Sequence, residues 1–108
     1  MRVLLDECVN TGVRAAFPGT DVKTVTEIGW RSSKDGPLLS FAQNSFDVFV
    51  TIDRKLEHQQ NIGLLNLGIV VVHVRNNELN SYRALFEALL RAVKTVRAGQ
   101  SIQVSSAN

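Results

Sequence analysis

The chain has 108 residues, of which 44% are apolar and 20% charged, and its formal net charge is +2. These values fit one globular domain with a hydrophobic core, and they exclude a disordered tail, a low-complexity linker and a disulfide-rich scaffold. The longest apolar stretch, residues 64–74, is interrupted by Asn66 and His73. It is too short for a membrane helix, which needs about 20 residues, so no membrane partner is expected.

Acidic and basic residues are distributed unevenly along the chain, and the sequence contains one cysteine. Residues 1–54 carry six basic and seven acidic residues, whereas residues 55–108 carry six and three. The single cysteine, Cys8, cannot form an internal disulfide, and Asp6 comes too early to leave room for a signal peptide. We therefore expect a cytoplasmic protein.

Short apolar or β-branched runs predict five strands. The first is buried, the second lies nearer an edge, the third and fourth are central and the last is short; they cover residues 2–5, 21–26, 47–52, 68–74 and 102–104. Residues 105–108 are expected to form a frayed tail.

Helix-compatible segments alternate with these strands. Residues 7–17 predict a helix, the segment 29–36 is loop-like, and Pro37 suits the first turn of a helix that runs to about Asn44. Residues 54–67 are helical or irregular, and residues 82–96 show the clearest helical period.

Alternating strands and helices predict an α/β fold, a small doubly wound parallel sheet with helices on both faces. Five strands best fit the order 2-1-3-4-5 in a single domain over residues 1–104. In that order the topological switch point lies between the first and third strands, where open α/β sheets bind ligands.

Acidic residues stand at this expected switch point. Asp6 and Glu7 follow the first strand, and Asp53 follows the third. Neighbouring strands lie about 4.8 Å apart, so close carboxylates would repel each other unless a divalent cation such as Mg²⁺ or Mn²⁺ bound between them. The alternative is that each aspartate caps a helix. Asp35 and Glu27 are weaker candidates, since Asp35 also fits a helix start.

At these acids the chain resembles a known family. The runs LLDE, EIGWRSSKDGPLLSFA, FDVFVTIDRKLEHQQN and GIVVVHVR are similar to the DUF5615 family of PIN-like proteins, over roughly residues 1–97. The resemblance implies a PIN-like fold and an Mg²⁺- or Mn²⁺-dependent ribonuclease, of the kind common as the toxin of a prokaryotic toxin–antitoxin pair. Its partners would then be an RNA substrate and a small antitoxin protein.

The resemblance also implies roles for individual residues. Asp6 and Asp53 match the family's acids after the first and third strands, and Asp35 matches an acidic position before a long helix; together they would hold the metal. Glu7 or Glu57 would orient the attacking water, while Arg54 and Lys55 would bind phosphate. Many relatives carry a second acid three residues after the one that Asp53 matches, and here that position is Leu56.

Two other readings stay open. A catalytically silent PIN-like interaction module, capable of forming a homodimer, is favoured by Leu56. A receiver-like phosphoacceptor domain would share the sheet order and the acids, but no lysine follows Lys94 in the chain.

Overall fold

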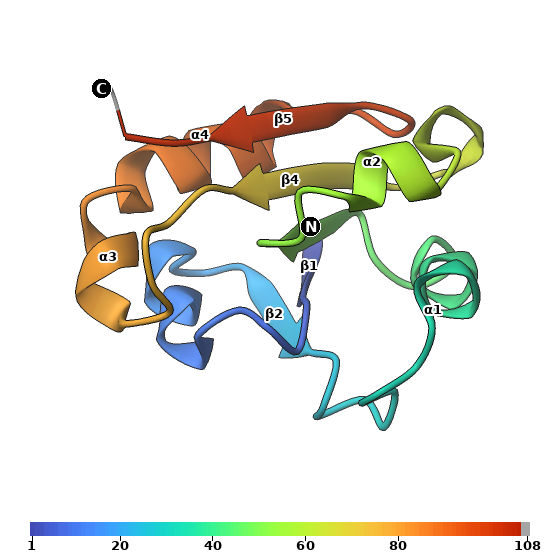
Figure 1. Cartoon of the computed structure of the whole chain (residues 1–108), viewed down its shortest axis with the longest axis horizontal. Helices are drawn as coiled ribbons and strands as arrows, with labels where there is room; N and C mark the ends of the chain where they lie inside the picture. The colour runs from blue at the N-terminus through green and yellow to red at the C-terminus, as the bar shows by residue number, and fades with distance from the viewer. Residues whose placement is uncertain (107–108) are drawn as a thin grey trace.

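A five-stranded, all-parallel sheet organises the protein, which we describe from a computed structural model covering residues 1–106. The strands are β1 (Arg2–Leu5), β2 (Asp21–Thr24), β3 (Val48–Thr51), β4 (Gly68–Val72) and β5 (Ser101–Val104). Their order is β2-β1-β3-β4-β5, which confirms the predicted topology (Figure 1).

Burial explains which strands are central. Every residue of β3 and β4 is buried, as apolar runs without alternation predict for a sheet covered on both faces. The edge strand β2 alternates exposed and buried residues. The strands are one to two residues shorter than predicted at some ends, within the usual uncertainty of strand boundaries.

Two layers of helices cover the sheet (Figure 1). Because successive strand residues point to opposite faces, Val3 and Leu5 belong to one core and Leu4 to the other. The first core includes the 3₁₀ helix η1 (Thr11–Ala16) and the helices α3 (Leu79–Arg83) and α4 (Phe86–Thr95). The second includes α1 (Asp35–Ala42), α2 (Leu56–Gln59) and the 3₁₀ helix η2 (Ile62–Leu64).

The helix predicted over residues 7–17 is wrong in its first part. Only η1 is helical, and residues 7–9 form a turn that ends in a bend. The turn is closed by the amide of Val9, which donates to the carbonyl of Asp6 at 3.0 Å. The side chain of Asn10 then accepts from the amide of Gly12 at 2.9 Å, and this local hydrogen bond starts the helix at Thr11.

The single helix predicted over residues 82–96 is two helices. The chain breaks between α3 and α4 at Leu85, whose φ of −105° and ψ of 0° are not helical. This break lets Tyr82, which is fully buried, and Leu85 both reach the core. Burial of two large side chains overrides the local helical period.

The remaining segments agree with the prediction. Helix α1 begins two residues before Pro37, and residues 54–67 hold α2 and η2 with irregular connections. Ser105 and Ser106 lie outside any helix or strand, while residues 107–108 of the expected tail lie outside the described residues. No helix within residues 1–106 has the length and apolar character needed to cross a bilayer.

Candidate functional site

The carboxyl ends of β1 and β3 meet at the switch point of the sheet. Leu5 pairs with Val50 across these two strands, and the amide of Asp6 donates to the carbonyl of Val50 at 2.9 Å. Asp6 therefore leaves the sheet beside the last residue of β3, Thr51. The sequence predicted this proximity of the two strand ends.

The carboxylate of Asp6 is buried and held at both oxygens. Its Oδ2 accepts from the Thr51 hydroxyl at 2.7 Å, and its Oδ1 accepts from the amide of Glu7 at 2.8 Å. Asp6 is 8% exposed and Thr51 is fully buried. A buried carboxylate needs such donors, because an unpaired charge in this environment is costly.

Thr51 also connects Asp6 to Asp53. Its hydroxyl oxygen accepts from the amide of Asp53 at 3.0 Å while donating to Asp6. Sequence reasoning missed this residue, because a threonine at the end of a strand is explained by β propensity alone. The available signal was its position two residues before Asp53, from which a hydroxyl can accept the aspartate's amide.

Asp53 is half-buried and takes part in a local turn. Its Oδ1 accepts from the amide of Lys55 at 2.9 Å, a contact of the kind expected from the helix-capping alternative. Helix α2, however, begins at Leu56 after the capping residue Lys55, so Asp53 lies two residues before the cap. One carboxylate oxygen of Asp53 is thus hydrogen-bonded to the backbone amide of Lys55.

Asp35 brings a third aspartate to this edge from the start of α1. Burial raises the pKa of its carboxyl group, and the charges of three carboxylates raise it further: Asp6, Asp53 and Glu7. The pKa of Asp35 thus responds to the charges of the other three predicted acids. An excess of negative charge at one place is the condition that a bound cation relieves.

Glu7 is exposed and fixes the loop that carries Asp35. Its Oε1 accepts from the amide of Ser32 at 2.9 Å, and Ser32 has a φ of 64°, in the left-handed region. A side chain after β1 thereby holds the connection between β2 and α1.

The basic candidates directly follow Asp53 in the chain and are exposed. Arg54 and Lys55 are exposed, and within residues 1–106 neither forms an ion pair. Their position immediately after Asp53 leaves both side chains accessible to an anionic ligand at the carboxyl edge of the sheet.

Two other acids are engaged elsewhere. Glu57 accepts hydrogen bonds from Ser101 and Gln103 of β5, so its carboxylate is occupied at the sheet edge. Glu27 pairs with Arg14 and accepts from the amide of Thr24. The bond from Arg14, followed by that from Thr24, lowers the pKa of Glu27, as expected for a structural ion pair.

Cys8 lies beside this cluster, with its Sγ 3.8 Å from the Thr51 hydroxyl oxygen. Burial raises the pKa of the thiol, and the nearby charge of Asp6 raises it further. The thiol therefore stays protonated at neutral pH and is a poor nucleophile.

The carboxylates at the switch point are ligands of the kind that a hard divalent cation prefers, but they do not form a coordination site in this structure. Among residues 1–106, no group of three or more Asp, Glu, His or Cys side chains is arranged to hold a metal ion. Oxygen donors are the ligands that Mg²⁺ and Mn²⁺ prefer. Coordination by three of them therefore requires rotation of at least one side chain.

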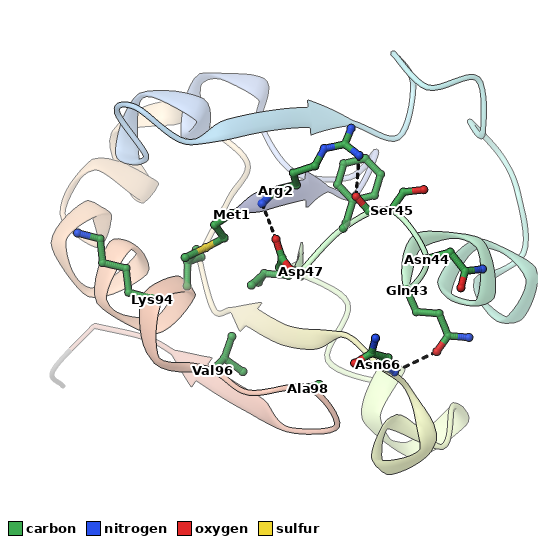
Figure 2. A pocket seen from close by; sticks show the side chains of 13 residues that line it. Met1, Arg2, Gln43, Asn44, Ser45, Asp47, Asn66, Lys94, Val96 and Ala98 are labelled. Atoms are coloured by element: carbon green, nitrogen blue, oxygen red, sulfur yellow. Dashed lines mark hydrogen bonds between the residues drawn. The ribbon is translucent and has the colours of Figure 1, made fainter.

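A separate cleft of about 680 Å³ opens at the opposite, amino edge of the sheet (Figure 2). Arg2 crosses it: its amide donates to Oδ2 of Asp47 and its guanidinium to the carbonyl of Ser45, each at 2.7 Å. The guanidinium also lies over the ring of Phe46. These contacts engage the charged side chains of Arg2 and Asp47. None of the acids at the switch point lines this cleft.

Comparison of the chain with known proteins gave no match to a family model, a curated protein or a solved structure.

Proposed function

We propose that the protein is a PIN-like, divalent-metal-dependent ribonuclease of the DUF5615 type. The observation that carries the proposal is the position of Asp6 and Asp53 at the carboxyl ends of the adjacent strands β1 and β3, where the Thr51 hydroxyl connects them. Glu7 follows Asp6, and Asp35 begins α1. After burial, the charges of Asp6, Asp53 and Glu7 raise the pKa of Asp35, which supports placing Asp35 with the other three acids. Four acids at one ligand-binding edge are more than helix capping requires.

Asp6, Asp53 and Asp35 would hold Mg²⁺ or Mn²⁺. When bound, such an ion lowers the pKa of an attacking water and offsets the charge that develops on a phosphodiester. Thr51 holds the Asp6 carboxylate in place, since it donates to Oδ2. Glu7 would orient the water, and its Oε1 already accepts from the amide of Ser32.

Arg54 and Lys55 would bind the phosphates of the RNA. Both are exposed, and within residues 1–106 both are free of ion pairs. Arginine binds phosphate through paired N–H donors and lysine through its point charge. Their cations would also offset the repulsion between the acids and an RNA backbone.

The first prediction tests the acids. Asp6→Asn combined with Asp53→Asn should abolish Mn²⁺-dependent cleavage of single-stranded RNA, because two of the three metal-holding carboxylates lose their charge. Cleavage is measured on labelled RNA with and without Mn²⁺. Asp21→Asn is the matched control, since Asp21 lies on the edge strand β2 in an exposed pair with Arg2. Equal cleavage by the double variant and the parent would refute the assignment.

A catalytically silent interaction module is the second candidate. It is favoured by the lack of a three-ligand arrangement within residues 1–106 and by Leu56, which is fully buried. Calorimetric titration with Mg²⁺ and Mn²⁺ separates the two proposals. Absence of binding at millimolar ion supports the silent module.

We place the proposed ribonuclease in the cytoplasm as the toxin of a toxin–antitoxin pair. This part rests on the resemblance of the motifs around Asp6, Asp35 and Asp53. A small antitoxin would be its protein partner, and a homodimer its own assembly. Expression of the chain alone should arrest growth of a bacterial host, and the Asp6→Asn and Asp53→Asn double variant should not.

A further inference from the structure

The connection from β2 to α1, residues 25–34, begins against the carboxyl end of β1. The amide of Val25 donates to the carbonyl of Leu5, the last residue of β1, at 2.9 Å. The amide of Trp30 then returns to the carbonyl of Val25 at 3.0 Å, which closes the first part of the connection. Since Leu5 directly precedes Asp6, these two hydrogen bonds keep the backbone of the connection close to the switch point.

The second part of this connection is anchored as well. The amide of Ser32 donates to the carboxylate of Glu7 at 2.9 Å. The Trp30 ring stacks on the ring of Phe41 in α1, with the ring centroids 4.7 Å apart. The segment 31–34 is therefore held next to the acids by contacts that do not involve its own basic side chains.

This segment carries two exposed basic residues, Arg31 and Lys34. Arg31 lies between two residues whose amides are hydrogen-bonded, and Lys34 directly precedes Asp35. Within residues 1–106, neither of the two side chains forms an ion pair. Each of these cations therefore has a fixed backbone and a charge that no acid of the described chain neutralises by pairing.

The strand order separates this segment from the other basic pair at the same edge. Strand β1, which ends just before Asp6, lies between β2 and β3. Arg31 and Lys34 belong to the connection that follows β2. Arg54 and Lys55 belong to the connection that follows β3. The two basic pairs thus leave the sheet on either side of the strand that carries the first acid.

We propose that residues 31–34 form a second phosphate-binding segment, which holds a single-stranded RNA on the other side of the acids from Arg54 and Lys55. This inference rests on the proposed function. Two separated pairs of cations suit a chain of repeated phosphates, whereas one phosphate needs only one pair. The RNA is held on both sides of the phosphodiester at the acids, so this bond lies within the strand and not at its end.

The test is equilibrium binding of a labelled oligouridine, followed by fluorescence anisotropy at low salt without divalent metal, so that the RNA stays intact. Arg31→Gln combined with Lys34→Gln should weaken binding about tenfold, because two phosphate contacts are lost. The slope of log affinity against log salt should flatten by about 1.4, since each contact with a single strand contributes about 0.7. A loss of structure alone would not change this slope in proportion to the charges removed.

Lys94→Gln combined with Arg97→Gln is the matched control. Both residues are exposed and unpaired within residues 1–106, and they have the same spacing as Arg31 and Lys34. Lys94 lines the cleft at the amino edge, so this variant loses the same charge at the opposite edge of the sheet and should bind close to the parent. Arg31→Lys combined with Lys34→Arg keeps both charges and should also bind like the parent. Thermal unfolding checks that each variant is folded.

Cleavage of the same RNA in Mn²⁺ separates this inference from the proposed function. The second segment is overturned if the parent does not bind RNA, if the Arg31→Gln and Lys34→Gln variant binds like the parent, or if the control variant loses as much affinity. A parent that binds through Arg31 and Lys34 but cleaves nothing refutes the nuclease and keeps the segment. In a parent that cleaves, loss of the two cations should raise KM and leave kcat nearly unchanged, because neither residue contacts the reacting bond.

Discussion

At the scale of single residues, the buried hydroxyl of Thr51 is the centre of the candidate site. It donates a hydrogen bond to the carboxylate of Asp6, which lies 45 residues earlier in the chain. It also accepts a hydrogen bond from the backbone amide of Asp53. A valine of similar shape would remove both bonds while the Asp6 carboxylate remained buried. The Thr51 side chain therefore contributes to the stability of the fold and also fixes the positions of Asp6 and Asp53.

Thr51→Val should reduce the free energy of unfolding by about 1–3 kcal/mol, the usual cost of a buried polar group that loses its partner. Urea unfolding measures this, and Mn²⁺ affinity should fall in the same variant. Thr26→Val, the same change at an exposed turn residue, should shift stability by less than about 0.5 kcal/mol. Thr51→Ser keeps the hydroxyl and should restore metal affinity; if Thr51→Val is as stable as the parent, the bond network is unimportant.

The raised pKa of Asp35 predicts a pH dependence of stability. The folded chain holds this proton more tightly than the unfolded chain, because burial and the charges of Asp6, Asp53 and Glu7 disfavour ionisation. Its contribution to stability is therefore greatest at low pH and falls as pH rises from the ordinary carboxyl value of 3.8 through the raised value.

Asp35→Asn should remove this dependence. Relative to the variant, the parent should lose stability as pH rises through the raised pKa, and thermal unfolding from acidic to neutral pH measures the difference. If the stability of the two proteins changed in parallel with pH, burial and the neighbouring charges would not raise the pKa of Asp35.

At the scale of elements, close contact between β4 and the end of α4 requires a glycine at the first position of the strand. A Cβ at Gly68 would lie 2.8 Å from Cγ1 of Val96 and 3.3 Å from the carbonyl oxygen of Arg97. The second of these atoms belongs to backbone, which cannot rotate away. The segment that follows α4 thus lies too close to β4 to leave room for a side chain at this position.

Gly68→Ala should lower stability by about 1–3 kcal/mol, as overpacking does in a well-filled interior. Gly63→Ala is the control, because Gly63 is exposed and its added Cβ would meet only Oδ1 of Asn61, at 3.7 Å. Chemical denaturation of the three proteins gives the comparison. Equal losses in both variants would point to a backbone effect instead of the contact with Val96.

At the scale of the whole molecule, the proposed metal site would link metal binding to folding. A ligand that binds only the folded chain stabilises it, by about 2.7 kcal/mol at one hundred times its dissociation constant. Saturating Mn²⁺ should therefore raise the melting temperature of the parent and of Asp21→Asn, but not that of the Asp6→Asn and Asp53→Asn double variant. If millimolar Mn²⁺ left the melting temperature of the parent protein unchanged, the metal proposal would be contradicted.

The sequence by itself determined the sheet. Runs such as those of β3 and β4 are buried on both faces, and their alternation with helical segments leaves few connections other than right-handed crossovers. The strand order followed, and with it the meeting of Asp6 and Asp53 at one edge. These features depend on local composition and general topological rules, so they are readable from the chain alone.

Only the tertiary structure decided the break at Leu85, the engagement of Glu57 with β5 and the place of Thr51 between two aspartates. Each of these depends on partners distant in sequence, whose packing outweighs the local preference. Periodicity reports which face of an element is apolar, but it does not report which distant group will satisfy a particular hydroxyl, carboxylate or ring.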